Sequence, residues 1–198
     1  IHLHSEFSKF EYRPNLDIQS YGYQSTKFLL DNSFIPPDID RAYTSIISDL
    51  FENIKKCFKT CGGYKAFKIH GDLHPSNILT QNEMIKIVDL DDARNGPSIQ
   101  DLWMFLSGSR EDQEKQMALL LEGYEEFRSF DYRELHLIEA LRSLRILHYT
   151  AWIAKRWDDP AFKIAFPWFG TPRFWDDHIL SLREQLSLTQ EPPLNILL

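Results

Sequence analysis

The strongest constraint on the fold is a change of hydrophobic period along the chain. Residues 39–59 carry apolar side chains at spacings of three and four, which predicts one amphipathic helix. The helical spacing returns in residues 111–127, 132–157 and 173–187, whereas short strand-like pieces lie within residues 65–89. Because the helical segments are long and the strand-like segment is short, we expect an α+β fold that is mostly helical.

The strand-like segment divides into shorter pieces. Residues 65–70 predict one short strand. Residues 77–80 and 85–89 predict a small β-hairpin, with Gln81 and Asn82 in its turn. Since a hairpin returns the chain on itself, its two outer ends should lie side by side.

Two other segments lack a clear period. Residues 1–38 are rich in aromatic residues and contain the extended break Arg13-Pro14, so we expect them to be irregular. Pro160, Pro167 and Pro172 predict a loop before the last helix.

The composition is that of an ordinary globular protein. Hydrophobic residues make up 43% of the chain and aromatic residues 14%, enough for a substantial core. A net charge of −7 disfavours a nucleic-acid partner, which would require a basic surface. No apolar run approaches the roughly 20 residues that cross a bilayer, and no basic-then-apolar leader opens the sequence. We therefore expect a cytoplasmic protein without a membrane partner, in which Cys57 and Cys61 are reduced thiols.

Candidate functional residues are concentrated in residues 70–77 and 88–92. Phosphoryl transfer needs a carboxylate beside the attacking hydroxyl and oxygen ligands for magnesium. Asp72 and Asn77 are five residues apart, the spacing of the base and the metal-ligand Asn in a kinase catalytic loop. Asp89 follows an apolar strand across the hairpin from Asn77, so the two side chains can converge on one ion.

Each of these residues also has an ordinary structural explanation. Asp72 and Asn77 are common turn formers, and Asp89 could belong to an acidic, solvated loop with Asp91 and Asp92. The joint spacing and the strand context favour the functional interpretation.

Three neighbouring residues are candidates for supporting roles. We expect His70 to pack under the loop and orient its backbone, whereas His74 could face the phosphate or close the turn. Asp101 could bond the amides of the loop or, with Ser98, cap a helix that starts there. The sequence leaves both pairs of alternatives open.

The pattern His-Gly-Asp-x-His-x-x-Asn, followed by a strand that ends in Asp, is similar to the aminoglycoside phosphotransferase and choline kinase-like superfamily. The run from Val88 to Met104 resembles a narrower group, the bacterial stress response kinase A group of serine/threonine protein kinases. The likeness covers nearly the whole chain and continues through residues 123–127, 152–157, 159–162, 166–168 and 190–193.

The resemblance implies a role for each candidate. Asp72 would be the proton acceptor, and Asn77 and Asp89 the ligands of Mg²⁺, with ATP as co-substrate and a protein Ser or Thr hydroxyl as acceptor. Ser76 departs from the Gly that the family often has, at a small cost in backbone freedom.

The resemblance also implies that the chain is the C-terminal lobe of a kinase-like fold. Residues 1–38 would follow the hinge between the lobes, where Ile1-His2 resembles the start of a helix, and residues 39–198 would form the helical lobe. The family's N-terminal lobe, with its phosphate-covering loop and ATP-contacting Lys, has no counterpart, and the chain starts at Ile1 without Met. We therefore expect a fragment that needs this missing lobe as a partner and is inactive alone.

Three alternatives remain at this stage. A small-molecule kinase acting on homoserine, choline or an aminoglycoside would use the same base, and only residues 88–104 favour a protein kinase. A chain of this kind could also be a remnant without activity. A dinuclear metallophosphoesterase would use His70, Asp72 and His74, but it needs further His motifs. The other histidines after the loop, each alone in a helical pattern, are His136, His148 and His178.

Overall fold

A computed structural model describes residues 10–82 and 84–196 of the chain. These residues form two compact units. The loop unit comprises the described parts of residues 1–16, 60–138 and 192–198, and the helical unit comprises residues 17–59 and 139–191. The expectation for Ile1-His2 falls outside the described residues.

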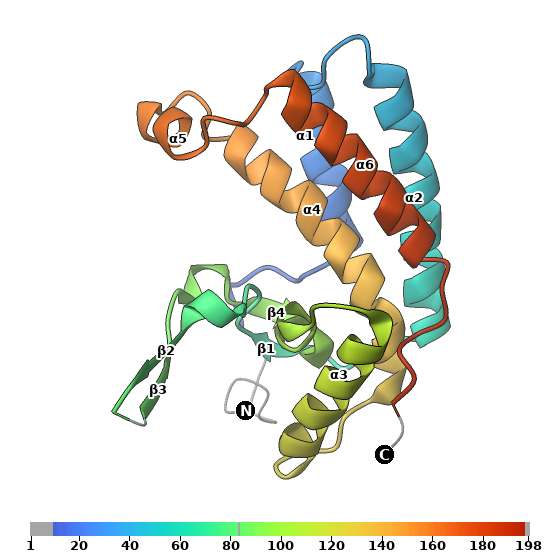
Figure 1. The fold of residues 1–198 in the computed structure, drawn as a ribbon, viewed down its shortest axis with the longest axis vertical. Coiled ribbons are helices and arrows are strands. Elements are labelled where there is room, and N and C mark those ends of the chain that lie inside the picture. The colour runs from blue at the N-terminus through green and yellow to red at the C-terminus, as the bar shows by residue number, and fades with distance from the viewer. Residues whose placement is uncertain (1–9, 83, 197–198) are drawn as a thin grey trace. The chain divides into compact units, whose positions relative to one another are not determined.

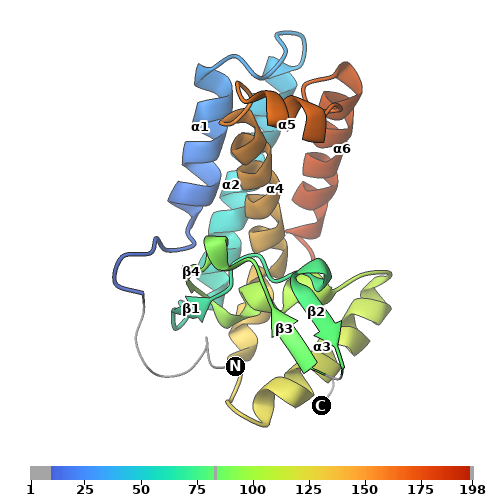
Figure 2. The same ribbon diagram turned by 90° about the vertical axis from the view of Figure 1, so that its left-hand side faces the viewer.

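Long helices build the helical unit, as their apolar spacing predicts. Figures 1 and 2 show α1, α2, α4 and α6 lying side by side. Their buried faces meet in a core that includes Tyr43, Leu50, Leu144, Leu147 and Trp175. The elements are a π-helix at Ile18–Tyr23, α1 (Gln24–Asp31), α2 (Asp40–Cys61), α4 (Ile138–Ala154), α5 (Pro160–Ala165) and α6 (Pro172–Leu188), with the last two residues of α2 and the first of α4 in the loop unit.

The helices predicted at 39–59 and 173–187 are confirmed by α2 and α6. The helix predicted over 132–157 is confirmed only in part, because residues Tyr132–Leu137 form a 3-10 helix before α4 begins.

Two segments predicted to be irregular are helical. Residues 18–31 form the π-helix and α1, which start where Asp17 Oδ1 accepts a hydrogen bond from Ser20 N at 2.7 Å. Their order comes from packing, since Tyr21 stacks on His148 with ring centroids 4.0 Å apart. In the predicted loop after residue 157, α5 begins because Asp159 Oδ1 accepts from Ala161 N at 2.8 Å and Pro160 occupies the first helical turn.

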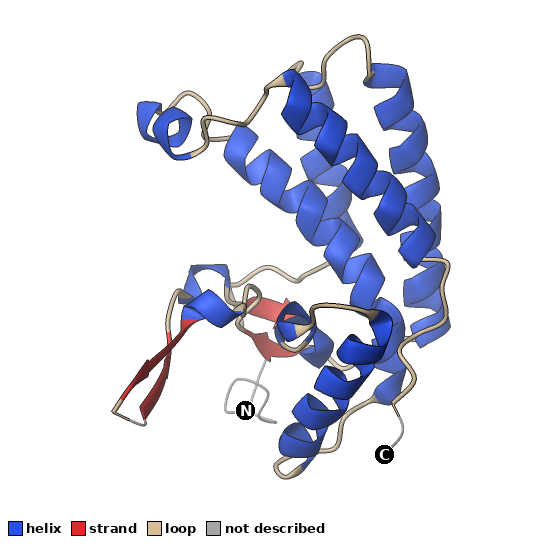
Figure 3. Cartoon of the chain, in the orientation of Figure 1, coloured by secondary structure: helices blue, strands red, loops and turns tan. Residues whose placement is uncertain are grey.

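The loop unit holds both small sheets, drawn as arrows in Figure 3. β2 (Ile78–Gln81) and β3 (Met84–Ile87) form the predicted hairpin, and β1 (Phe67–Ile69) is the predicted strand. β1 pairs antiparallel with β4 (Arg94–Gly96), a strand that the sequence pattern did not indicate. The remaining long element is α3 (Arg110–Glu125), whose predicted bounds are confirmed to within two residues.

The pairing of β1 with β4 positions the candidate site. Ile69 lies opposite Arg94 in this ladder, so residues 70–93 form an excursion whose two ends are held together. Residues 70–77, which hold candidate site residues, and the hairpin both belong to this excursion (Figure 1). The chain is thus mostly helical with small sheets, as predicted, and no helix in the described residues is long and apolar enough to span a membrane.

A matched pair of Gly→Ala substitutions tests the packing of the helical unit. A Cβ on Gly22 would lie 2.5 Å from Phe51 Cε1 and 3.0 Å from Leu144 Cδ2, whereas one on Gly123 would meet nothing within 4 Å. We expect Gly22→Ala to lower the free energy of unfolding by about 1–3 kcal/mol through overpacking. Gly123→Ala should raise it by up to about 1 kcal/mol, because alanine favours the helix.

Urea unfolding followed by circular dichroism measures both changes. If both substitutions raised, or both lowered, the free energy of unfolding, the close approach of the π-helix to α2 and α4 would be contradicted.

Candidate active site

The candidate catalytic loop, residues 70–77, is held at its start by one carboxylate. Asp101 Oδ2 accepts a hydrogen bond from His70 N at 2.7 Å, and Asp101 Oδ1 accepts from Gly71 N at 2.9 Å. Asp101 is 3% exposed, so both bonds form out of water. Of the two roles that the sequence left open for Asp101, the structure shows the contact with the loop amides.

The alternative, a capped α-helix starting at Ser98, is wrong. Residues Ser98–Asp101 form a 3-10 turn that has no side-chain cap. The Ser98 hydroxyl instead donates to Glu134 Oε2 at 2.8 Å. A serine and an aspartate three residues apart resemble a capping motif, but buried partners elsewhere in the fold take both side chains.

Gly71 is required by the path of the loop. Its φ of +87° lies in the left-handed region, and a Cβ there would come within 2.4 Å of the Asp92 carbonyl oxygen. The outgoing and returning arms of the excursion therefore touch at this residue.

His70 is buried under the loop. Its ring Nε2 lies 2.8 Å from the Val88 carbonyl oxygen, and its side chain is fully shielded from solvent. This contact joins the start of the loop to the residue before Asp89. The position fits the orienting role expected from the sequence.

Backbone bonds fold residues 72–77 into a tight turn. His74 N donates to the Asp72 carbonyl at 3.0 Å, and Asn77 N donates to the His74 carbonyl at 2.9 Å. His74 therefore closes the turn, and its Nε2 also lies 3.6 Å from Asp72 Oδ2. The backbone of His74 takes part in the turn, and contact of its side chain with a phosphate stays a prediction.

Asn77 connects the turn to the returning strand. Its Nδ2 donates to the Asp72 carbonyl at 3.0 Å, and its own carbonyl accepts from Val88 N at 3.1 Å. The structure therefore joins Asp72 to Asn77, and Asn77 to the residue next to Asp89. All three candidates belong to the same excursion of the chain.

Asp89 has an unusual backbone. Its φ and ψ are both 63°, in the left-handed region that non-glycine residues seldom adopt. Among the described residues its exposed side chain makes no hydrogen bond or ion pair. A strained residue with an uncommitted carboxylate at a strand end is an indication of function.

The donor set fits a magnesium ion. Because the Asn77 amide nitrogen is bonded to Asp72, the side-chain oxygen is the atom left for a ligand. Mg²⁺ commonly takes one or two carboxylate or amide oxygens, with water and phosphate supplying the rest. In the described ranges no three His, Cys, Asp or Glu side chains gather to hold a metal, but a site of this kind does not need three.

The acidic residues after Asp89 have other partners. Arg94 Nη2 forms an ion pair with Asp92 Oδ1 at 2.5 Å, and Arg94 Nε donates to the Asp92 carbonyl. Arg13 donates to the Asp91 carbonyl at 2.6 Å. These contacts shape the returning arm, and Arg94 engages the carboxylate of Asp92, whereas Arg13 engages only the backbone of Asp91.

Sequence reasoning missed Gln100. Its Nε2 donates to the Gly71 carbonyl at 2.8 Å, and its Oε1 accepts from Trp103 Nε1 at 3.1 Å. Gln100 is 1% exposed. The only signal in the sequence is a pair of polar residues, Gln100 and Asp101, between Ile99 and Leu102, and this pattern does not indicate a partner.

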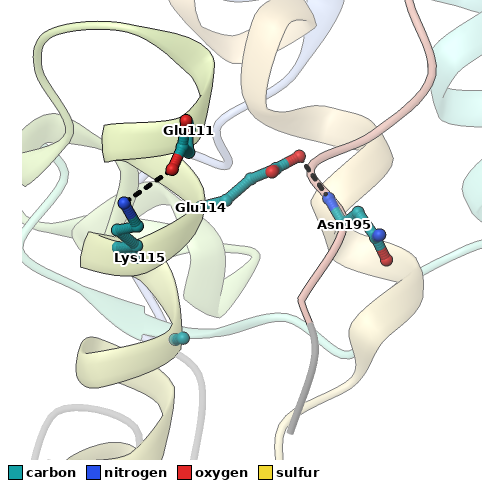
Figure 4. Close-up of a pocket in the computed structure, with 5 residues that line it drawn as sticks. Glu111, Glu114, Lys115 and Asn195 are labelled. Carbon is teal, nitrogen blue, oxygen red and sulfur yellow. Dashed lines mark hydrogen bonds and ion pairs between the residues drawn. The ribbon is translucent and has the colours of Figure 1, made fainter.

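A separate pocket of the loop unit involves none of these residues (Figure 4). It is lined by Glu111, Glu114, Lys115, Ala118 and Asn195. Lys115 pairs with Glu111 at 2.7 Å, and Glu114 Oε1 accepts from Asn195 N at 2.9 Å. Its charged groups pair within α3 and bond to the C-terminal segment.

Comparison with known proteins points to one family. The phosphotransferase enzyme family matches residues 38–138, which include every candidate residue of the site. A stress response kinase A from Escherichia coli O157:H7 is 38% identical over 94% of this chain. A protein named serine/threonine protein kinase RdoA from Salmonella typhimurium is 37% identical over the same share. The chain spans 56% of the length of each relative.

A solved structure shares the fold. It is a choline/ethanolamine kinase family protein from Mesorhizobium loti, and the match covers 92% of this chain and 62% of the Mesorhizobium loti chain. The TM-score is 0.57 and the sequence identity is 18%. At that identity the likeness concerns the arrangement of elements alone.

The double contact of Asp101 can be tested by Asp101→Asn. An amide keeps one acceptor but turns an N–H₂ group toward a backbone N–H, so one buried donor is left unsatisfied. We expect a loss of about 1–3 kcal/mol in the free energy of unfolding, measured with urea.

The control is Asp112→Asn, at an exposed capping box where the carboxylate accepts from Ser109. This substitution should lower the free energy of unfolding by less than about 1 kcal/mol. A smaller loss at residue 101 than at residue 112 would show that the loop does not depend on Asp101.

Proposed function

The chain belongs to the phosphotransferase enzyme family, and we propose that it supplies the catalytic loop of an ATP- and magnesium-dependent kinase that acts on Ser or Thr hydroxyls of proteins. The observation that carries the proposal is the hydrogen-bonded series from Asp72 through Asn77 to the residue before Asp89.

Asp72 would be the base. A carboxylate beside the acceptor hydroxyl orients its oxygen toward the phosphate and receives its proton as the new O–P bond forms. The turn closed by His74, and the hold of Asp101 on the preceding residues, keep the Asp72 backbone in one place. Such positioning is a large part of the catalysis of phosphoryl transfer.

Asn77 and Asp89 would hold the metal. A bound Mg²⁺ would neutralise negative charge on the phosphate oxygens. Asn77 offers its side-chain oxygen because its nitrogen is engaged, and the left-handed backbone at Asp89 sets the direction of that carboxylate. Their backbones adjoin across the hairpin, which supports a shared ion.

The choice of a protein acceptor rests on the relatives. One relative at 37% identity carries the name serine/threonine protein kinase, and others carry the name stress response kinase A. A small alcohol would use the same base and the same metal ligands. Comparing phosphate transfer to protein Ser and Thr with transfer to choline, homoserine and an aminoglycoside would distinguish the two.

We also propose that the 198 residues act only as part of a larger protein. The relatives are nearly twice as long, and phosphoryl transfer requires that the nucleotide phosphates be held as well as the base placed. The activity test therefore uses the chain expressed with the coding sequence that surrounds it.

In that longer protein Asp72→Asn should abolish transfer. An amide cannot accept the proton of the hydroxyl, so we expect kcat for transfer from labelled ATP to fall by about 10²–10⁴-fold, the usual contribution of general-base catalysis. Unchanged MgATP affinity would show that the loss lies in chemistry. Transfer at the normal rate would refute the role of Asp72.

The metal role of Asp89 is tested against its neighbour. Asp89→Asn should raise the Mg²⁺ concentration for half-maximal transfer by about tenfold or more, since it removes a charged ligand. Asp91→Asn removes the same charge two residues away and should leave the Mg²⁺ dependence within about twofold, because exposed charges contribute little. Equal shifts in both variants would indicate a general effect of the acidic loop rather than ligation.

A further inference from the structure

The loop unit contains a second buried carboxylate that the proposed chemistry does not use. Glu134 is 1% exposed and lies in the 3-10 helix Tyr132–Leu137. Its Oε2 accepts hydrogen bonds from Ser98 Oγ at 2.8 Å and from Ile99 N at 2.9 Å. Glu134 thus holds the first two residues of the turn Ser98–Asp101.

The last two residues of the same turn hold the catalytic loop. Asp101 accepts the N–H groups of His70 and Gly71, and Gln100 donates to the Gly71 carbonyl. The turn has four residues, so a shift at its start is passed directly to its end. Two sets of buried hydrogen bonds, connected by the backbone of the turn, therefore link Glu134 to the residues before Asp72.

We infer that Glu134 is a positioning residue, which fixes the turn Ser98–Asp101 and through it the peptide groups of His70 and Gly71. The consequence for phosphate transfer rests on the function proposed above, because the loop ends in Asp72. The effect of Glu134 on the position of these peptide groups requires no nucleotide, so it can be measured without an activity assay.

The surroundings of Glu134 make this hold sensitive to pH. Burial raises the pKa of Glu134 to about 7, against the opposing effect of the hydrogen bonds from Ile99 and Ser98. The titratable groups that interact with it are Arg133 on its own element, Asp131 at the N-cap of that element, Tyr124 on α3, and Cys61 at the end of α2.

The direction of this pH dependence follows from the linkage between proton binding and the opening of the site. When the site opens to water, the pKa of Glu134 returns toward its ordinary value of 4.5, so opening releases a proton between pH 4.5 and about 7. The hold is therefore fully present below pH 4.5 and weakens as the pH rises to about 7.

Amide hydrogen exchange tests the inference on the chain itself. In Glu134→Ala, Ser98 Oγ and Ile99 N lose their acceptor. The amides of His70 and Gly71 should then exchange on the order of tenfold faster, relative to the amides of Met117 and Leu121 in α3. Glu134→Gln is the matched control, because its carbonyl oxygen can accept both bonds, and the four amides should keep their relative rates.

The indole of Trp103 provides a second measurement, since its N–H donates to Gln100 in the same turn. Its NMR resonance should shift with a midpoint near pH 7 in the wild-type chain and stay constant in Glu134→Gln. This comparison decides the matter should Glu134→Ala fail to fold.

An equal loss of protection at all four amides, or an indole resonance that does not titrate, would overturn the inference. Because neither measurement involves ATP, failure here is distinct from failure of the proposed phosphotransfer. In the longer protein, the kcat profile of the wild type should change between pH 4.5 and 7 in a way that Glu134→Gln lacks.

Discussion

The site depends on how one short stretch of backbone satisfies its hydrogen-bonding groups. Where the chain leaves β1, the N–H groups of His70 and Gly71 and the carbonyl of Gly71 are buried and no longer belong to a sheet. Buried peptide groups without partners are costly. Two adjacent side chains, Gln100 and Asp101, supply all three partners, so the path of the candidate catalytic loop is set by a turn about thirty residues away in sequence.

The second constraint is the pairing of β1 with β4. This ladder ties together the ends of residues 70–93, and the hairpin inside it returns the chain to Asn77. The close approach of Gly71 to the Asp92 carbonyl, and the contact of His70 with the Val88 carbonyl, join the two arms. Asp89 is thereby held in a left-handed conformation that it would seldom adopt in a free loop.

These features explain why the candidate residues can lie within one small excursion while most of the chain is helical. The strands β2 and β3 are largely exposed and add little core. The order of the excursion comes from the buried polar bonds at its base, which Gln100 and Asp101 form with His70 and Gly71. Polar bonds formed out of water are stronger and more specific than the same bonds at a surface.

The sequence by itself determined the mostly helical α+β class, the hairpin, and the family pattern from Asp72 to Asp89, because these depend on local period and spacing. It did not indicate the helix at residues 18–31 or the strand β4, whose order comes from packing partners distant in the chain. Nor did it choose between the two roles of Asp101 or point to Gln100 and Glu134. Only the tertiary structure decided these, since the partner of a buried polar side chain is set by which distant backbone the fold brings to it.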